Sequence, residues 1–259
     1  MSDPFVPRVG GVLSADIAVP EHERELRFYS RVLTTGETPL WREDLMNNHG
    51  APVIGLGAAS PEYGDLPLQW MPHIQVADVG ASVKRALDLG GSEVMHGKDE
   101  DGNSQWAVLL DPNGAAFGLV PVVPAEAIPP IDADAASVGR IAWLDLTVEN
   151  ADATRDFYRE VVGWSVQDVD MKDGDEPYAD YSMLDGDGEG AAGVCHARGR
   201  NRGLPPVWLI YLPVGDLAES LRLVREEGGT VIKETAPDSR YASAVIQDPV
   251  GVSLALVAG

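Results

Sequence analysis

The chain has 259 residues, 44% of them hydrophobic and 7% aromatic, and it carries a formal net charge of -22. A single core usually spans about 100 to 200 residues, so this length predicts two domains. The negative charge repels phosphate backbones and anionic lipid surfaces, so we expect neither nucleic acid nor a membrane as a partner.

No apolar run approaches the ~18 residues of a membrane span, and the N-terminus lacks the pattern of a signal peptide. The single cysteine, Cys195, permits no internal disulfide and no thiolate metal cluster. A chain without disulfides fits a reducing compartment. We therefore predict a cytoplasmic protein that is a monomer or a homodimer.

The first half of the chain contains two units, each with a strand, a helix and then further strands. Its first helix is amphipathic, with Phe28 and Tyr29 on the apolar face. Its second helix ends at a Gly-Gly pair, and the half closes with a hairpin around the turn Asp-Pro-Asn-Gly. In chain order, the expected elements are a strand at 14–20, a helix at 21–33, a strand at 51–58, a strand at 70–79, a helix at 81–91, a strand at 92–95 and a hairpin at 105–120.

The second half repeats this order. The helix dipeptide Phe-Tyr recurs at residues 157–158, and the hairpin dipeptide Asp-Pro recurs at 248–249. The expected elements are a strand at 141–148, a helix at 151–164, strands at 180–184, 191–197 and 208–217, a helix at 218–229, a strand at 230–234 and a hairpin at 243–257.

Residues 123–138, between the two halves, are rich in Pro, Ala and Asp and show no periodicity, which is typical of a linker. The repeat therefore predicts an α+β fold of four βαβββ modules. Two modules form a first domain at residues 1–122, and the other two form a second domain at 139–259.

These motifs resemble those of the vicinal oxygen chelate superfamily, which includes glyoxalases, bleomycin resistance proteins and extradiol dioxygenases. The resemblance rests on the helices "RFYSRVL" and "DFYREVVGW", the turns "VADV" and "VGDL", the two Gly-Gly pairs and the hairpins "DPNG" and "DPVG". It covers nearly the whole chain and looks closest to the tandem, two-domain glyoxalase-like branch. It implies that each domain is a curled sheet around a cavity.

In metal-dependent members of that superfamily, His, Gln or Glu side chains on the opening and closing strands surround a cation. The matching positions in this chain are poor ligands, and they are Ser14, Met71 and Gly118 in the first half and Trp143, Leu209 and Ala255 in the second. The fourth position falls near Gly55 or Leu56, and near Gly193 or Val194. The resemblance therefore predicts no bound metal, and we expect no other cofactor.

Side chains alternate along a strand, so a residue two positions after an inward one also points inward. Asp16 follows Ser14 in this way, and His73 follows Met71. We predict Asp16 and His73 as catalytic residues, with His73 as a general base whose tautomer and basicity Asp16 sets. A buried Asp that bonds to a His is also a common structural clasp, and that alternative stays open.

The second half has Asp145 and Tyr211 at the corresponding positions. Small residues leave room around Asp16 and His73, whereas Trp143 is large enough to fill the second cavity. We therefore expect the first domain to be the working one and the second to be more structural. The predicted substrate-binding residues, chosen for small size, polarity or aromatic area, are Ser14, Trp70, Trp106, Gly118, Trp143, Asp145 and Tyr211.

Three functions remain open from the sequence, and the first two take a small-molecule partner. The first is a metal-independent isomerase, lyase or hydrolase. The second is a non-catalytic protein that binds or sequesters a planar metabolite or antibiotic. The third is a regulatory or structural protein with closed cavities. Cys195 and His196 are adjacent on a strand and face opposite sides, so we do not expect them to form a nucleophile pair.

Overall fold

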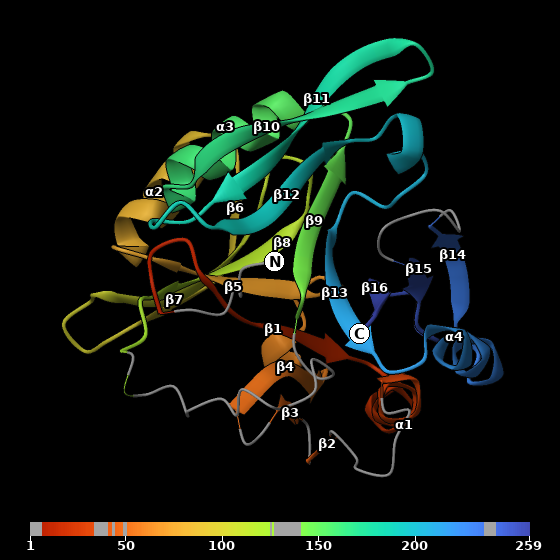
Figure 1. Ribbon diagram of the computed structural model, residues 1–259. Helices are drawn as coiled ribbons and strands as arrows, with labels where there is room; N and C mark the ends of the chain where they lie inside the picture. The colour runs from red at the N-terminus through yellow and green to blue at the C-terminus, as the bar shows by residue number, and fades with distance from the viewer. Residues whose placement is uncertain are drawn as a thin grey trace. The chain divides into compact units, whose positions relative to one another are not determined.

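The computed structural model describes residues 7–33, 41–42, 45–48, 51–124, 126, 141–235 and 242–259. The expected linker at 123–138 falls mostly outside these residues. In the described part, the elements form four successive βαβββ modules (Figure 1). The predicted α+β fold is therefore confirmed. None of the described helices is long and apolar enough to cross a membrane.

The bounds of the elements are as follows. The first module has β1 (Val12–Val19), α1 (His22–Leu33), β2 (Trp41–Arg42), β3 (Leu45–Asn48) and β4 (Ala51–Ala58), then a 3-10 helix at Pro61–Tyr63. The second has β5 (Met71–Val76), α2 (Val79–Asp88), β6 (Ser92–Lys98), β7 (Ser104–Leu110) and β8 (Ala116–Pro121). The third has β9 (Trp143–Val148), α3 (Ala151–Val162), β10 (Ser165–Asp173), β11 (Glu176–Leu184) and β12 (Gly190–His196), then a 3-10 helix at Gly199–Asn201. The fourth has β13 (Trp208–Val214), α4 (Leu217–Glu226), β14 (Thr230–Glu234), β15 (Ser243–Gln247) and β16 (Ser253–Ala258).

Strand β10 was not predicted from the sequence. Most of its side chains are exposed, and Met171 is the one residue of this strand that is classed as buried. A strand with so little buried surface has no apolar alternation to recognise. It is held instead by its antiparallel pairing with β11 along its full length.

Three helices begin at a residue whose side chain caps the first turn. Asp78, Asn150 and Asp216 each accept a hydrogen bond from the backbone N–H three residues later, at 2.9, 3.1 and 3.0 Å. Such a cap satisfies an N–H that has no partner inside the helix and contributes about 1 kcal/mol. The turns "VADV" and "VGDL" are therefore helix starts, as their position in the repeat predicts.

The Gly-Gly pairs end α2 and α4 by the same geometry. The first glycine of each pair, Gly90 or Gly228, has a φ of 90°, which side chains rarely tolerate. The second glycine passes close to backbone, because a Cβ on Gly91 would lie 2.9 Å from the carbonyl oxygen of Leu110. Both positions therefore require glycine.

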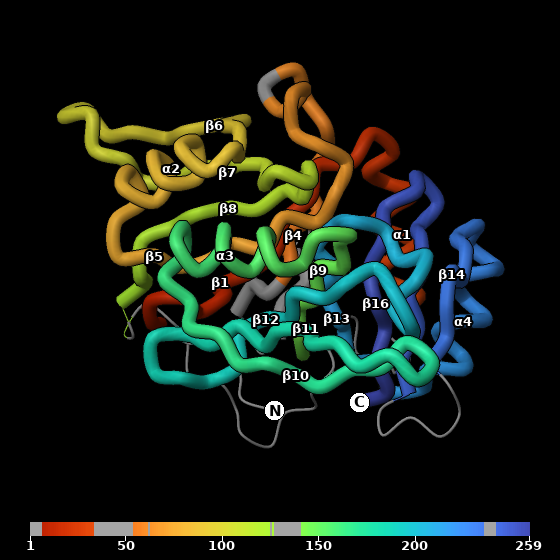
Figure 2. The backbone as a smooth tube through the Cα atoms, turned by 90° about the horizontal axis from the view of Figure 1, so that it is seen from above, coloured from red at the N-terminus to blue at the C-terminus, as the bar shows by residue number. Residues whose placement is uncertain are grey.

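Two compact units make up the described chain, and each combines modules from both halves. The first unit contains the second and third modules with the residues up to Leu13, and the second unit contains the rest of the first module and nearly all of the fourth. In the first unit α2 lies beside α3, and in the second α1 lies beside α4 (Figure 2). The division follows helix packing and does not coincide with the two halves of the sequence.

Every module arranges its four strands in the same way. The strand orders are β5-β8-β7-β6 and β9-β12-β11-β10 in the first unit, and β1-β4-β3-β2 and β13-β16-β15-β14 in the second. In each module the opening strand pairs in parallel with the last strand of that module. The opening strand is therefore the first strand in the order of each module. Most of the predicted site residues lie on these opening strands.

Candidate functional site

The opening strand β1 carries Ser14 and Asp16 on one side. Both are half-buried, whereas Ala15 and Ile17 between and after them are fully buried. Asp16 faces Gly55, its partner in the parallel strand β4. The alternation that placed Ser14 and Asp16 on one face is therefore present.

Strand β5 carries His73, which is half-buried and lies opposite Gly118 of β8. A Cβ on Gly118 would lie 3.0 Å from Cδ2 of His73. The imidazole thus occupies the space that a side chain at position 118 would need. A glycine at position 118 therefore leaves space for the His73 ring.

Trp106 of β7 extends the same face. Residues directly opposite each other on neighbouring strands point to the same side, and Val108 is opposite Gly118. Trp106 precedes Val108 by two residues, so it shares that side. Its indole lies over Gly97 of β6, and 40% of Trp106 remains exposed. We call His73, Gly97, Trp106, Val108 and Gly118 the His73–Trp106 face, and all five belong to the first compact unit.

Strand β9 carries Trp143 and Asp145, also in the first unit. The indole N–H of Trp143 donates to Oδ1 of Asp145 at 2.8 Å. The two half-buried side chains lie over Gly190 and Gly193 of β12, where any Cβ would contact them. Trp143 therefore binds the carboxylate of Asp145 and covers part of the sheet face formed by β9 and β12.

Tyr211 is the predicted residue on the opening strand of the fourth module. Tyr211 of β13 is half-buried and opposite Ala255 of β16. Asp16 and Tyr211 belong to the second compact unit, whereas His73 and Asp145 belong to the first.

Trp70 has a core environment and does not line an open face. It is 1% exposed, and its indole N–H donates to the Tyr29 hydroxyl at 3.3 Å. The two rings make an edge contact with their centroids 5.6 Å apart. Trp70 stands directly before β5, and its burial against α1 was not visible from its place in the repeat.

An Asp–His contact that the sequence reasoning missed lies on β11 and β12. Asp180 is 3% exposed and accepts the backbone N–H of His196 at 2.8 Å. Its carboxylate is also 3.2 Å from Nδ1 of His196 and 3.0 Å from Nδ2 of Asn201. These contacts tie the 3-10 helix after β12 to the sheet, as a structural clasp does. Pairing between strands brings the residues together, which spacing in the sequence does not reveal.

Burial also favours the protonated form of the Cys195 thiol. Removal from water, followed by the nearby charges of Asp145 and Asp180, raises the pKa of its thiol well above the ordinary value. The neutral thiol is a weak nucleophile. This agrees with the expectation that Cys195 and His196 do not form a nucleophile pair.

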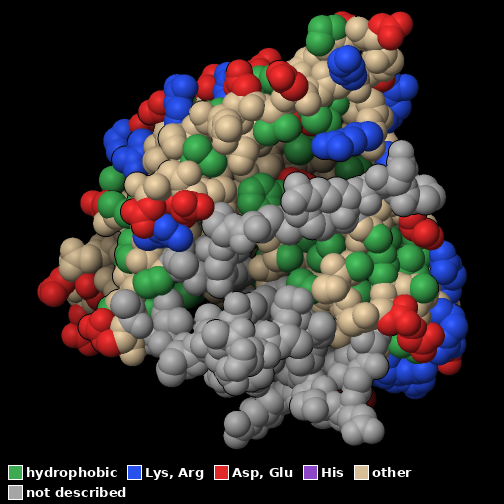
Figure 3. Space-filling view, viewed as in Figure 1, with side chains coloured by type: hydrophobic (Ala, Val, Ile, Leu, Met, Phe, Trp, Pro, Cys, Tyr) green, Lys and Arg blue, Asp and Glu red, His purple; other side chains and the backbone are tan. Residues whose placement is uncertain are grey.

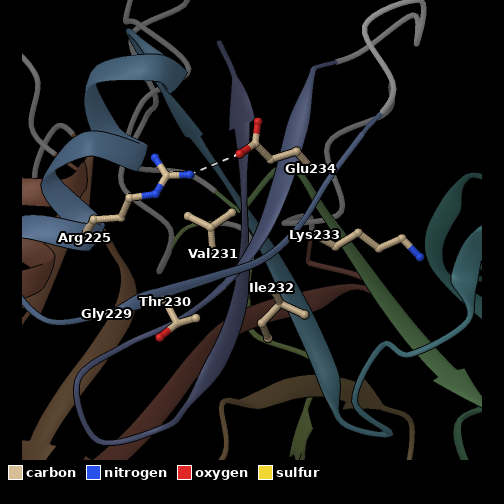
Figure 4. A pocket seen from close by; sticks show the side chains of 7 residues that line it. All are labelled: Arg225, Gly229, Thr230, Val231, Ile232, Lys233 and Glu234. Atoms are coloured by element: carbon tan, nitrogen blue, oxygen red, sulfur yellow. Dashed lines mark hydrogen bonds and ion pairs between the residues drawn. The ribbon is translucent and has the colours of Figure 1, made fainter.

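A hollow lies on the second unit, and none of the predicted site residues lines it. It has a volume of about 410 Å³ and is lined by Arg225 of α4 and by residues 229–234 on β14. Figure 4 shows Arg225 bonded to Glu234 across it, at 3.2 Å. Arg225 and Glu234 therefore use their charges on each other.

Many of the described arginine side chains elsewhere are paired with acidic ones. On the face seen in Figure 3, basic and acidic side chains are intermixed over the described elements. On α4, for example, Arg222 contacts both Glu219 and Glu226. The described surface in this view therefore presents no concentrated basic patch for a polyanion.

Two family models match this chain. The model of the Glyoxalase/Bleomycin resistance protein/Dioxygenase superfamily matches residues 140–256, and that of the Glyoxalase-like domain matches residues 14–120. Among curated proteins, the anthracycline biosynthesis protein DnrV of Streptomyces peucetius is 27% identical over 206 residues, 78% of this chain and 69% of DnrV. The putative glyoxylase CFP32 of Mycobacterium bovis is 29% identical over 203 residues, 78% of this chain and 73% of CFP32.

Solved structures share the fold at low identity. The 2,2',3-trihydroxybiphenyl 1,2-dioxygenase of Sphingomonas wittichii has a TM-score of 0.57 at 12% identity, with coverage of 97% of this chain and 91% of the dioxygenase. The Mn(II)-bound glyoxalase of Novosphingobium aromaticivorans has a TM-score of 0.54 at 14% identity, with coverage of 97% and 82%.

The side chains described at the positions that correspond to the ligands in metal-dependent members do not fit a metal centre. Among the described residues, no group of three or more His, Cys, Asp or Glu lies close enough to hold a metal ion. Two of the positions considered from the sequence, Leu209 and Ala255, are apolar and fully buried. The family matches and the four modules nevertheless agree, and the chain belongs to the glyoxalase/bleomycin resistance/dioxygenase superfamily, the vicinal oxygen chelate superfamily.

Proposed function

We propose that this protein binds a small, flat organic metabolite on the His73–Trp106 face. The observation that carries the proposal is the exposure of Trp106, which is 40% accessible on a strand face where Gly97 and Gly118 remove competing side chains. A large indole left open to water offers apolar area and a surface for ring stacking. The nearby imidazole of His73 adds a polar group that can orient a ligand.

The names of the relatives suggest which flat molecule to test. DnrV is named for anthracycline biosynthesis, and anthracyclines contain fused planar rings. A simple fused-ring probe is 1,4-dihydroxyanthraquinone, whose own absorbance and fluorescence report binding. This choice tests the chemistry of stacking without assuming that the natural ligand is an anthracycline.

The test compares three proteins by titration with that probe. Trp106→Ala removes the stacking surface and is expected to weaken binding about tenfold, which corresponds to about 1.4 kcal/mol. Val169→Ala is the matched control, because Val169 is also 40% exposed but lies on β10. Equal affinity of the Trp106→Ala and wild-type proteins would contradict binding at this face.

We also infer a metal-independent isomerase, lyase or hydrolase activity, in which His73 exchanges a proton with the ligand and Asp16 is the second proposed catalytic residue. Each side chain is half-buried and has a glycine as its neighbour in the adjacent strand. An imidazole titrates near neutral pH and suits a general base. Asp145 is held by Trp143, which favours the first half as the working one.

Native mass spectrometry and elemental analysis of untagged protein test this activity. We expect a co-purified small molecule without stoichiometric metal, and we expect His73→Gln and Asp16→Asn to abolish its conversion while Asp145→Asn does not. A stoichiometric transition metal, or loss of conversion in Asp145→Asn alone, would contradict the proposal. Binding without conversion in the wild-type protein would leave the sequestering function as the better description. A cytoplasmic location and a monomer or homodimer complete the proposal.

A further inference from the structure

Glu25 is a buried acid whose oxygens receive no ordinary donor. It lies in the first turn of α1 and is 0% exposed. Neither carboxylate oxygen accepts a hydrogen bond from an N–H or a hydroxyl of the described residues. Another acid, Asp248, acts on it, because after burial itself the charge and the hydrogen bonding of Asp248 both raise the pKa of Glu25. Two carboxyl groups can share a hydrogen bond only when one of them carries a proton.

Asp248 is well provided with donors, which shows where the proton lies. Its Oδ1 accepts the backbone N–H groups of Val250 and Val252 at 3.1 and 2.8 Å, and its Oδ2 accepts the Tyr29 hydroxyl at 2.8 Å. These donors favour the charged form of Asp248. Glu25 has no such donors, so the shared proton belongs mainly to Glu25.

The corresponding site in the first unit contains no second acid. There Thr154 of α3 occupies the place of Glu25, and Asn113 occupies the place of Val250. The Asn113 amide donates both to Asp111, at 3.1 Å, and to Thr154, at 2.9 Å. The fold therefore accepts a neutral bridge at this contact, and the acid pair is a particular property of the second unit.

The charged groups around Glu25 do not neutralise it. Arg24 and Glu21, at the start of α1, bond to each other at 2.8 Å and are exposed. On α4, Glu227 is engaged by Arg27 and Arg31. Burial first, and the charge of Asp248 second, raise the pKa of Glu25 to about 8. Burial likewise raises the pKa of Asp248, and the pKa of Tyr29 is raised well above its ordinary value.

We propose that Glu25 and Asp248 share one proton near neutral pH, and that loss of this proton at alkaline pH loosens the packing of α1 on the turn between β15 and β16. The inference is independent of the proposed ligand site. In the unfolded chain Glu25 loses its proton near its ordinary value of 4.5, so the folded state binds more protons between about pH 4.5 and 8. The contribution of the shared proton to the stability of the second unit is therefore fully present below about pH 4.5. It is lost as the pH rises through about 8.

Hydrogen exchange measured by mass spectrometry at pH 6 and pH 9, corrected for intrinsic exchange rates, tests the proposal on the full chain. We expect the opening equilibrium of α1 to rise about a hundredfold between pH 6 and pH 9, whereas that of α3 changes little. Glu25→Gln keeps the shape of a protonated acid and is expected to remove most of the rise. Glu23→Gln removes the same charge from an exposed position of α1 and is the control.

Equal responses of α1 and α3, or an unchanged response in Glu25→Gln, would overturn the proposal. Carbon-13 NMR of the side-chain carboxyl groups gives a second test that needs no variant. One glutamate carboxyl in the wild-type protein should titrate near pH 8. If all glutamate carboxyls titrate below about pH 6, the proton is not shared and the proposal fails, even if Glu25→Gln does not fold.

Discussion

In the first compact unit a neutral amide bridges helix and turn, whereas in the second unit two acids meet at the same place. The common part is a tyrosine whose hydroxyl contacts the Asp of the hairpin turn, Tyr158 with Asp111 at 3.4 Å and Tyr29 with Asp248 at 2.8 Å. A tryptophan at the start of the next module donates to each tyrosine, Trp208 to Tyr158 at 2.9 Å and Trp70 to Tyr29 at 3.3 Å. The Tyr–Asp and Trp–Tyr contacts are therefore common to both units. The helix residue beside the aspartate, Thr154 or Glu25, decides how the contact between helix and turn responds to pH.

The largest expected effect comes from removing the turn aspartates. Asp111→Ala leaves two backbone N–H groups and the Tyr158 hydroxyl without their acceptor, which we expect to cost about 3 kcal/mol in the local stability of α3. Asp248→Ala should cost α1 about half as much at pH 9, because it also relieves the repulsion of Glu25. Hydrogen exchange of the two helices measures both values, and a larger loss for Asp248→Ala would refute the difference between the units.

A second variant transfers the acid pair to the first unit. Thr154→Glu places a carboxyl group beside Asp111 in a contact that is 3% exposed at both residues. We expect a loss of about 2 kcal/mol in the local stability of α3 at pH 9 and a smaller loss at pH 6, since protonation removes the repulsion. Thr154→Gln, which has the same size without the charge, is the control. A loss that is equal at both pH values would show that size and not charge is responsible.

The smallest effect is expected from the reverse exchange. Glu25→Thr combined with Val250→Asn should rebuild the neutral bridge in the second unit. We expect the local stability of α1 to rise by about 1 kcal/mol at pH 9 and its dependence on pH to flatten. Val250→Asn alone serves as the comparison. If the double variant keeps the wild-type pH dependence, the acid pair is not the source of that dependence.

Most of the fold was accessible from local patterns in the sequence. The Gly-Gly pairs, the polar residues before helices and the Asp-Pro turns each satisfy a backbone requirement within a few residues, so they can be read without knowing what packs against them. Strand β10 was missed because its surface is mostly exposed and lacks an apolar period. A shared face for Ser14 and Asp16 could be proposed from the sequence, because alternation is a property of the strand itself.

The site was less accessible, because exposure depends on residues that are distant in the sequence. Trp70 and Trp106 looked alike as strand aromatics, yet one is 1% and the other 40% exposed. Trp70 is covered by α1, and no local rule indicates that contact. Gly118 was proposed as a substrate-binding residue because of its small size. Its packing against His73 becomes visible only from the register of β5 and β8.

By itself, the sequence determined the duplicated modules, their order and most helix and strand positions, because these follow from periodicity and turn chemistry within short segments. The tertiary structure decided that helix packing joins the second module with the third and the first with the fourth. It also decided that Glu25 is buried against Asp248, more than two hundred residues away in the chain. A charged residue at the start of a helix is usually solvated. Glu25 behaves differently because tertiary packing buries it beside a distant carboxyl group, and the loss of water favours its protonated form.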